Sequence, residues 1–278
     1  KMVIINDSSC VNCGLCQRIC PSGAICLINH SIDQRLCLEC YHCVAVCQSN
    51  AITNGLLPPV EAVDFFPRRN ELKNLILQRR SVRNYSSRKP ETDLLQSFIS
   101  DLRYSPTASN AQSLCFSIVT GQQVIERVND LTIATFRTAL KPFGNALLKP
   151  MLRLAMGHEA FERMNRYRLR FENPKNPRMV VYNAPAMIAV HAPDGKNSLA
   201  AMDASIWMGQ AVLYAPSLGL ASCINGFVVK AAKRNKQIAS LMGVPDGHQL
   251  HAVLLIGYPA TRFVNLVERR EPLVAIVD

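Results

Sequence analysis

After residue 70 the chain alternates between stretches of helical periodicity and short, wholly apolar runs. Apolar side chains recur at helical spacing over residues 72–79 and 93–102, which predicts two amphipathic helices. The apolar runs at 114–119, 186–191 and 252–257 have the length of buried strands. Helices that alternate with short strands in this way predict an α+β layered core.

Two longer stretches are also expected to be helical. Residues 133–170 form a long basic segment with apolar side chains at helical spacing. Asp203 is expected to cap the N-terminus of a helix that ends near Ser217. The uncharged run 204–229 is long enough to span a bilayer, but Pro216 interrupts it. We therefore expect a buried helix followed by a buried strand, and no membrane.

The first 50 residues carry two copies of one cysteine pattern. A C-x2-C-x2-C-x3-C spacing runs from Cys10 to Cys20, and it returns 27 positions later from Cys37 to Cys47. Three thiolates at this spacing can bind one face of an iron–sulfur cube, with a fourth ligand from elsewhere. A zinc ribbon needs two separated C-x2-C pairs, and a disulfide framework needs an oxidising compartment. Both of these alternatives fit the pattern less well, and the chain is expected to carry electrons.

This N-terminal segment resembles a bacterial-type two-cluster ferredoxin. The stretch from Cys20 to Ile25 also aligns with the stretch from Cys47 to Ile52, although Gln48 replaces the proline that follows the first quartet. In such ferredoxins the trailing cysteine of each pattern binds the other cluster. The resemblance therefore implies two [4Fe–4S] clusters with exchanged fourth ligands. One set is Cys10, Cys13, Cys16 and Cys47, and the other is Cys37, Cys40, Cys43 and Cys20.

Glycine and paired prolines after Ile52 indicate where this first domain ends. We expect a ferredoxin domain over residues 1–56, a linker over 57–67 and a second domain over 68–278. No long apolar stretch precedes a cleavage site near the N-terminus, so no signal peptide is expected. A cytoplasmic location is predicted.

The net charge of +11 raises the question of a nucleic-acid partner. Two bound clusters would offset roughly 4 of these charges, and a bound phosphate up to about 2 more. The basic residues also form short clusters, such as Arg79–Arg80 and Arg269–Arg270, rather than one long stripe. We do not favour nucleic acid as a partner.

Four segments of the second region carry a further resemblance. They are Arg79–Arg83, Ser105–Gln112, Leu218–Phe227, and Gly257–Pro259 followed by Arg270–Leu273. In order and spacing they resemble the nitroreductase family of FMN-dependent enzymes, which are interleaved homodimers. The resemblance covers residues 68–278 and implies a three-layer α+β domain around a central, mainly antiparallel sheet.

The resemblance also implies which residues bind FMN. The flavin phosphate is expected to lie against Arg79, Arg80, Ser81 and Arg83, with Arg270 as a second phosphate arginine, because guanidinium groups pair bidentately with phosphate. Thr107, Ala108 and Asn110 match a loop that reaches FMN across the dimer interface, although Ser113–Leu114 replace the usual Pro-Trp pair. Asn225 and Gly226 match positions beside flavin N5.

Together the two resemblances predict an FMN-dependent oxidoreductase. Its two [4Fe–4S] clusters would relay single electrons to or from FMN, which would reduce a nitroaromatic, a quinone or an activated alkene. The electron donor is left open between NAD(P)H and an external ferredoxin, and no catalytic residue is assigned. Two alternatives remain: a redox sensor or electron-transfer adaptor without a dedicated substrate, and an iron–sulfur protein that binds nucleic acid.

Residues 136–172 are expected to form a helical insertion in the second domain. Phe143, Phe161 and Tyr167 are candidates to line the active-site mouth, and plain packing between subunits is an equal alternative for this segment. Outside the two quartets, Cys26 and Cys115 are expected to be small buried side chains. The six histidines have no metal-like spacing, so no histidine-bound metal is expected.

Overall fold

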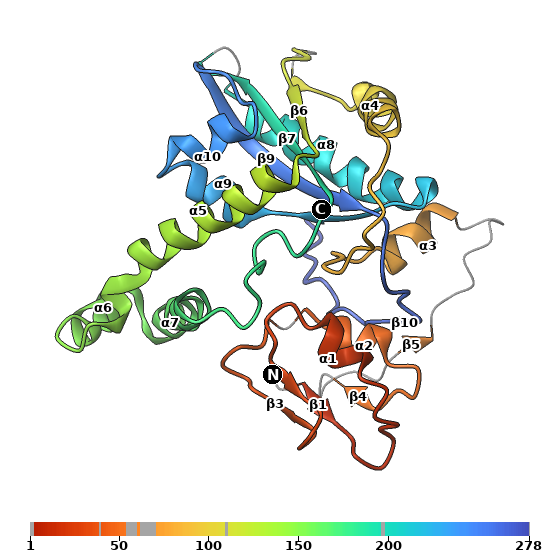
Figure 1. The fold of residues 1–278 in the computed structure, drawn as a ribbon, viewed down its shortest axis with the longest axis vertical. Helices are drawn as coiled ribbons and strands as arrows, with labels where there is room; N and C mark the ends of the chain where they lie inside the picture. The colour runs from red at the N-terminus through yellow and green to blue at the C-terminus, as the bar shows by residue number, and fades with distance from the viewer. Residues whose placement is uncertain are drawn as a thin grey trace. The chain divides into compact units, whose positions relative to one another are not determined.

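The protein divides into two units (Figure 1). A computed structural model describes residues 3–38, 40–53, 60–61, 71–108, 111–195 and 198–277. The first unit combines Lys1–Gln78 with Arg262–Asp278, and the second is Arg79–Thr261. This division differs from the expected one, because the C-terminal segment joins the first unit. The expected linker 57–67 lies outside the described residues except for Val60–Glu61.

The first unit repeats itself at the 27-residue offset of the cysteines. Its first half contains β1 (Ile4–Ile5), α1 (Leu15–Ile19) and β2 (Ile25–Cys26), and its second contains β3 (Ser31–Ile32), α2 (His42–Val46) and β4 (Ile52–Thr53). Strand β1 pairs with β4, and β2 pairs with β3, both antiparallel. Each ladder therefore joins one half to the other, as a duplicated and interleaved fold requires.

The backbone conformation repeats as well. Gly14 and Tyr41 precede the two helices with φ of 78° and 55°, and Gly23 and Asn50 follow them with φ of 60° and 52°. Glycine adopts this left-handed region without a steric cost, and asparagine tolerates it better than most residues. Tyr41 does not share this freedom, so the second half keeps the turn at a cost that the surrounding contacts must offset.

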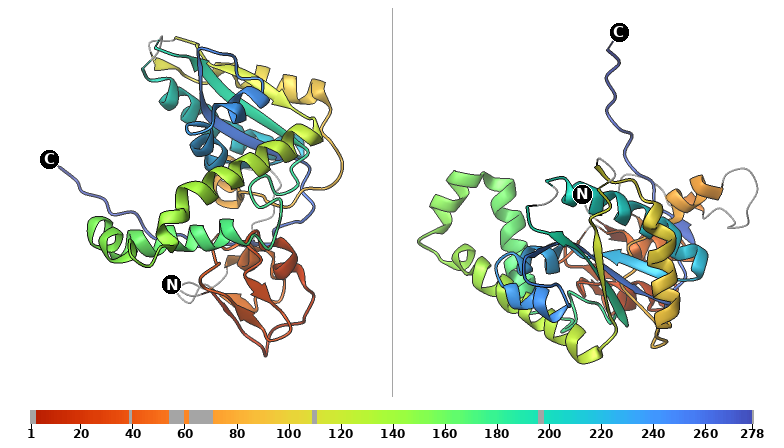
Figure 2. Two further views of the ribbon diagram at one scale, coloured as in Figure 1. Left: turned by 60° about the vertical axis from the view of Figure 1, so that its left-hand side comes forward. Right: turned by 90° about the horizontal axis from the view of Figure 1, so that it is seen from above.

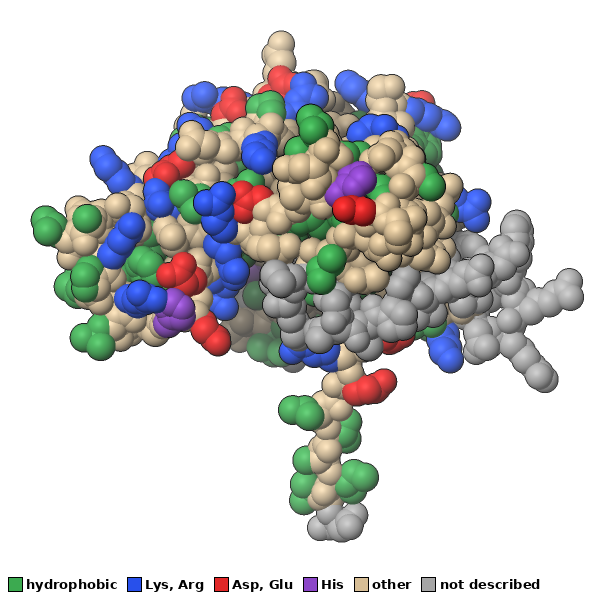
Figure 3. Space-filling model, turned by 90° about the horizontal axis from the view of Figure 1, so that it is seen from below, with side chains coloured by type: hydrophobic (Ala, Val, Ile, Leu, Met, Phe, Trp, Pro, Cys, Tyr) green, Lys and Arg blue, Asp and Glu red, His purple; other side chains and the backbone are tan. Residues whose placement is uncertain are grey.

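The C-terminal segment completes the first unit. Strand β10 (Asn265–Leu266) pairs with β5 (Val60–Glu61). The Asn265 side-chain amide donates to the carbonyl oxygen of Cys47 at 2.6 Å and to Oδ1 of Asn50 at 2.7 Å. Val267 joins the apolar core of this unit. The residues that follow carry exposed apolar side chains, which Figure 3 shows in green along the projecting tail.

A four-stranded antiparallel sheet forms the centre of the second unit. The strand order is β6-β7-β9-β8. The bounds are Cys115–Val119 for β6, Ala186–Pro193 for β7, Ala221–Ile224 for β8 and His248–Gly257 for β9. Every residue of β7 from Ala186 to Ala192 is buried. The central strands are therefore covered on both faces, as their continuous apolar sequence predicts.

Helices pack on both faces of this sheet. Alternate residues of β7 and β9, including Ile188 and Leu254, face α4 (Thr92–Asp101) and α8 (Ala200–Tyr214). Trp207 of α8 lies at the centre of this core and is 1% exposed. On the other face lie α5 (Gln122–Leu140) and α9 (Gly226–Ala232). Helix α10 (Lys236–Leu241) and the 3-10 turns η1 (Leu102–Tyr104) and η4 (Ala215–Leu218) also belong to this unit, whereas α3 (Glu71–Gln78) belongs to the first.

The basic segment 133–170 is helical but not continuous. Helix α5 ends at Leu140, the 3-10 turn η3 (Lys141–Gly144) follows, and α6 (Lys149–Met156) and α7 (His158–Glu172) complete the segment. Pro142 lies in the first break, and Gly157 forms the second with φ of 81°. These breaks let α7 return against α5 (Figure 2).

The expected N-cap at Asp203 is wrong. Helix α8 begins three residues earlier, at Ala200, and Asp203 lies buried in its first turn. Its carboxylate accepts the backbone N–H of Ala108 at 2.9 Å. A buried carboxylate needs such a donor, and the preceding loop supplies it. In the described part of the chain, no helix is both long and apolar enough to cross a membrane.

Gly257 gives a test of this packing. A Cβ atom there would lie 2.6 Å from Cδ and Cγ of Pro185 and 3.1 Å from Cδ1 of Tyr85. We expect Gly257→Ala to lower the free energy of unfolding of the second unit by about 1–3 kcal/mol, because overpacking forces its neighbours to shift. Urea denaturation followed by the fluorescence of Trp207, the single tryptophan, measures this unit selectively.

The control is Gly209→Ala in α8, where an added Cβ meets nothing within 4 Å. It should leave the unit unchanged or stabilise it by up to about 1 kcal/mol, since alanine favours the helix. Equal denaturation midpoints for Gly257→Ala and the wild type would contradict the predicted clash.

Candidate functional site

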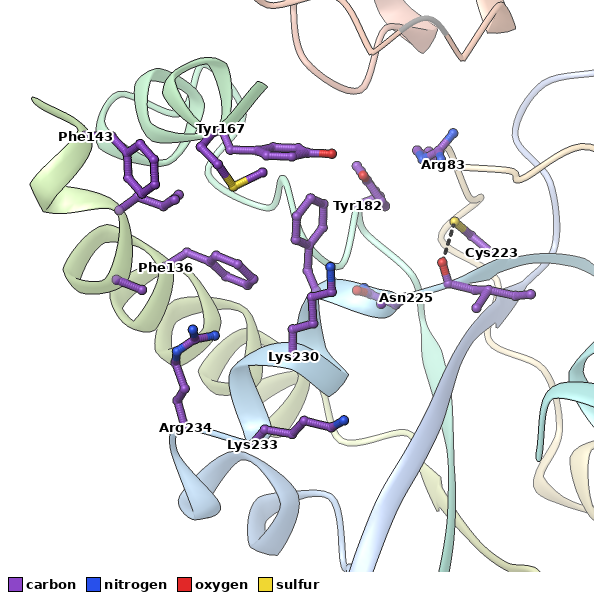
Figure 4. A pocket seen from close by; sticks show the side chains of 16 residues that line it. Arg83, Phe136, Phe143, Tyr167, Tyr182, Cys223, Asn225, Lys230, Lys233 and Arg234 are labelled. Carbon is purple, nitrogen blue, oxygen red and sulfur yellow. Dashed lines mark hydrogen bonds between the residues drawn. The ribbon is translucent and has the colours of Figure 1, made fainter. Parts of the chain in front are cut away.

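The second unit contains a cavity of about 980 Å³ between its sheet and helices α5, α7 and α9. Figure 4 shows its main side chains. Those that line it are Arg83, Phe136, Ala139, Leu140, Phe143, Met164, Tyr167, Tyr182, Cys223, Ile224, Asn225, Gly226, Phe227, Lys230, Lys233 and Arg234. The set includes Arg83, Asn225 and Gly226, three of the residues expected to hold FMN.

The helical insertion forms one wall of the cavity. Phe143 and Tyr167 line it as expected, whereas Phe161 is buried behind them, with its ring centroid 5.8 Å from that of Phe143. Phe227 of α9 packs edge-on against Phe136 at 5.3 Å and Tyr167 at 5.7 Å. These ring contacts attach the insertion to the cavity floor and keep that wall apolar.

The opposite wall contains the arginine segment that follows α3. The Val82 N–H donates to the Ser222 carbonyl of β8 at 3.0 Å, which fixes this segment to the sheet edge. The Arg83 guanidinium lies 5.6 Å from the centre of the Tyr182 ring. Arg79, Arg80 and Ser81 precede it and do not line the cavity. Of this segment, the structure brings only Arg83 to the cavity.

Asn225 holds the floor of the cavity in place. Its backbone N–H donates to the Val253 carbonyl at 2.8 Å, and its side-chain amide donates to the Val180 carbonyl at 2.7 Å. Its Oδ1 accepts the N–H of Val228 at 3.2 Å and caps α9. These polar groups of Asn225 are therefore occupied in holding the fold. The next residue, Gly226, is exposed, and a Cβ atom added there would meet no other atom within 4 Å. The main chain at Gly226 is therefore open to a flat ligand.

Three cations at the end of α9 were missed from the sequence. Lys230, Lys233 and Arg234 line the cavity beyond Asn225 and Gly226, and Figure 4 shows them below the aromatic wall. Lys230 lies in the last turn of α9, and Lys233 and Arg234 follow it at a spacing of three and four residues, directly after the helix ends at Ala232. That spacing, directly after the Asn-Gly pair, was the available signal. Together with Arg83 they give the cavity a positive charge that suits an anionic ligand.

Tyr182 adds a protonated hydroxyl to the cavity wall. Burial raises the pKa of this phenol above its ordinary value, although the positive charge of Arg83 acts in the opposite direction. Tyr182 therefore keeps its proton at neutral pH and is a potential hydrogen-bond donor. Cys223 also lines the cavity, with its thiol directed at the Ile224 carbonyl at 3.6 Å.

The remaining expected flavin residues lie elsewhere. The Thr107 hydroxyl accepts the Gln112 N–H at 3.0 Å, and the Ala108 N–H is bound to Asp203. Neither residue lines the cavity of its own chain, and Asn110 lies outside the described residues. Arg270 is exposed in the C-terminal segment of the first unit. The proposed roles of these four residues stay predictions.

In the first unit, the structure brings together the two expected cysteine quartets. Burial raises the pKa of the Cys16 thiol to about 11, and the neighbours that raise it further are Cys47, Cys10 and Cys13. Burial likewise raises the pKa of the Cys43 thiol, and the neighbours that raise it further are Cys40, Cys20 and Cys37. Each set contains the trailing cysteine of the other repeat. None of the eleven cysteines, all in the described part of the chain, forms a disulfide.

The two trailing cysteines have the same donors around sulfur. The Ala24 N–H lies 3.3 Å from Sγ of Cys20, and the Ala51 N–H lies 3.2 Å from Sγ of Cys47. The hydroxyls of Ser22 and Ser49 lie 3.6 and 3.5 Å from these sulfurs. Hydrogen bonds to sulfur help to set the reduction potential of an iron–sulfur cluster.

Comparison with known proteins finds one family match in each unit. Residues 76–258 match the model of the nitroreductase family. The chain belongs to this family. Residues 3–26 match the 4Fe-4S binding domain. The protein is thus an oxidoreductase of the nitroreductase family with an N-terminal 4Fe-4S binding domain and an α+β fold.

Several solved structures share the fold of most of this chain. A nitroreductase with bound FMN from Bacteroides fragilis is 22% identical, with a TM-score of 0.57 over 76% of this chain and 100% of its own. One from Desulfitobacterium hafniense, also with bound FMN, is 20% identical, with a TM-score of 0.55 over the same shares. An iodotyrosine deiodinase bound to FMN and 3-iodo-L-tyrosine is 18% identical, with a TM-score of 0.55 over 74% of this chain and 99% of its own.

One curated relative matches a short part of the chain. An uncharacterized protein of Methanocaldococcus jannaschii is 37% identical over 49 residues. The match covers 18% of this chain and 19% of that protein.

Gly226 allows a test of where the flavin lies. We expect Gly226→Leu to weaken FMN binding at least about tenfold, because the new side chain would project into the open space above the cavity floor. Gly226→Ala should have a smaller effect in the same direction. Flavin content after purification and fluorescence titration of the apoprotein with FMN measure both, and Gly209→Ala is the control. Unchanged FMN affinity in Gly226→Leu would place the flavin elsewhere.

The serine hydroxyls allow a test of the cluster sites. We expect the double variant Ser22→Ala and Ser49→Ala to have cluster potentials lower by an amount on the order of tens of millivolts, because donors to sulfur stabilise the more negative reduced cluster. Protein-film voltammetry measures this change. Ser31→Ala, whose hydroxyl donates to Asn29 instead, should leave the potentials unchanged. Equal shifts in both variants would exclude a specific effect of these hydroxyls.

Proposed function

We propose that this protein is an FMN-dependent reductase whose N-terminal clusters exchange single electrons with the flavin. Two [4Fe–4S] clusters are held by the quartet Cys10, Cys13, Cys16 and Cys47 and by the quartet Cys37, Cys40, Cys43 and Cys20. The second unit binds FMN in the cavity above Asn225 and Gly226. The acceptor is a small organic molecule: a nitroaromatic, a quinone or an activated alkene.

One observation carries this proposal: the cavity and the two quartets belong to the same chain. The cavity is lined by residues of two of the four family segments and of the insertion, and each quartet is assembled from both halves of the first unit. A cavity alone would suit a two-electron reductase, and the quartets alone would suit a carrier. Their presence on one chain supports the conversion between one-electron and two-electron transfer.

The cavity residues suit a flavin and a small acceptor. The aromatic and aliphatic wall offers a surface for a planar ring system. Arg83 on one side, and Lys230, Lys233 and Arg234 on the other, are available for the phosphate and for negative charge on the ring. FMN, when bound, accepts electrons singly or in pairs and passes them to the acceptor. Phe143 and Tyr167 of the insertion would then select acceptors by shape.

Two features support a homodimer with FMN at its interface. The loop that contains Thr107 and Ala108 does not line the cavity of its own chain. The C-terminal tail exposes Leu273, Val274, Ile276 and Val277, and a run of exposed apolar side chains of this kind marks an interaction surface. We further propose a cytoplasmic location, since thiolate ligands persist where cysteines are kept reduced.

Anaerobic stopped-flow spectroscopy tests the proposal. Protein reduced in full should be reoxidised by at least one nitro, quinone or enone compound, with about four electrons delivered per chain: two from the flavin and one from each cluster. If none of these compounds reoxidises the protein, it is not a reductase, and the sensor or adaptor function takes its place.

Cys43→Ser separates the two cofactors. We expect this variant to lose one cluster and to deliver fewer electrons per chain, because a buried ligand is replaced. Its dithionite-reduced flavin should still reduce the acceptor at a rate within about twofold of the wild type, because the cavity belongs to the other unit. Iron and flavin counts accompany the kinetics. Cys26→Ser, outside both quartets, is the control. Loss of flavin chemistry in a folded Cys43→Ser protein would contradict a relay role.

A further inference from the structure

Three potential metal ligands converge at one end of the central sheet of the second unit. They are Cys115 in β6, His191 in β7 and His248 in β9, and one ligand atom from each lies within 4.8 Å of the other two. Cys115 and His191 are direct cross-strand partners, and His248 pairs with Pro193, two residues beyond His191. The β-bulge between Val190 and His191 shifts the register there. The pairing of strands, and not the sequence spacing, brings the three together.

Hydrogen bonds fix the orientation of the buried histidine. The Ser117 hydroxyl donates to the Gly243 carbonyl at 3.0 Å, so its oxygen is left to accept the Nε2–H of His191 at 3.2 Å. With the proton on Nε2, the lone pair of His191 is on Nδ1. This Nδ1 faces Nδ1 of His248 at 2.9 Å. Histidine ligands commonly donate their second ring nitrogen to an oxygen in this way, which orients the ring for the metal.

We propose that Cys115, His191 and His248 bind one zinc ion through Sγ and the two Nδ1 atoms. A thiolate with two imidazoles is a ligand set that zinc favours, and three protein ligands leave a fourth tetrahedral position open. Zn–N distances of roughly 2.0–2.1 Å and a Zn–S distance of roughly 2.3 Å place the ligand atoms roughly 3.3–3.6 Å apart. The two nitrogens must therefore separate by about 0.4 Å from their observed distance of 2.9 Å.

The site is reachable from solvent. His248 lines an open cavity of about 410 Å³ that also contains Asp194 and Gln249, which gives the ion an entry path. None of the three residues belongs to a cysteine quartet or lines the flavin cavity.

Zinc here would join three strands of the sheet. An ion bound to the native protein but not to the unfolded chain stabilises the native state in proportion to its affinity. The bound ion would tie β6, an edge strand, to β7 and β9 at the end of the sheet where His248 begins β9. We therefore assign the site a stabilising role, independent of the redox cofactors.

Zinc binding to the intact protein tests this inference. Protein purified anaerobically with its clusters and flavin is dialysed against a chelator and then titrated with zinc, and zinc, iron and flavin are counted per chain. We expect one zinc per chain with iron unchanged. X-ray absorption at the zinc edge should show one sulfur and two nitrogen ligands. The thermal midpoint, read by Trp207 fluorescence, should rise with zinc.

Cys115→Ala and His248→Gln should each lower zinc affinity at least tenfold and remove the rise in thermal midpoint. Both residues are only half-buried, and Trp207 fluorescence with flavin content checks that the variants are folded. The controls are Cys26→Ala, half-buried and outside both quartets, and His158→Gln, on the exposed face of α7. Both should bind zinc as the wild type does.

Three results would overturn the inference. The first is no zinc retained above the level of a chelator-treated blank, which would leave the two histidines as a hydrogen-bonded pair. The second is zinc with four sulfur ligands and loss of iron, which would place it in the first unit. The third is unchanged zinc affinity in folded Cys115→Ala and His248→Gln proteins.

Discussion

Antiparallel pairing of β9 with β7 and β8 fixes the position of each functional group in the second unit. The Val253 carbonyl of β9 holds the backbone of Asn225, so the cavity floor is an extension of the sheet. The Ser222 carbonyl of β8 holds Val82, which brings Arg83 to the opposite wall. At its other end, the same sheet gathers Cys115, His191 and His248. A shift of register between these strands would move all of these groups at once.

The first unit follows a different principle, the exchange of segments between two similar halves. Both antiparallel ladders pair a strand of one half with a strand of the other. Each cysteine quartet likewise contains three cysteines of one half and one of the other. Neither half can form its quartet alone. Keeping this geometry in the second half costs conformational free energy at Tyr41, because Tyr41 adopts the left-handed backbone conformation that Gly14 adopts freely in the first half.

The sequence predicted best those features that depend on neighbouring residues. The cysteine patterns, the family segments at Arg83 and at Asn225–Gly226, and the central strands are all local signals. The structure forms the central strands, groups the cysteines in the first unit, and brings Arg83, Asn225 and Gly226 to one cavity. Lys230, Lys233 and Arg234 are also close together in the sequence, but the cavity that gives them a role is formed with distant helices. The grouping of Cys115 with two histidines depends on strand register and on a bulge, which spacing along the chain does not reveal. Asp203 was misassigned because its partner, the N–H of Ala108, is 95 positions away in the chain.

The path of the backbone has a consequence for biosynthesis. The cysteine-rich segment leaves the ribosome before the flavoprotein portion, yet Asn265, which binds the carbonyl of Cys47, and Phe263, which packs on His42 at 5.3 Å, are made after that portion. The whole flavoprotein portion is translated between these two parts. Native packing around the quartets therefore waits until residues 262–267 have been made, and a chain that stops before them would present its thiols to the cell without their final cover.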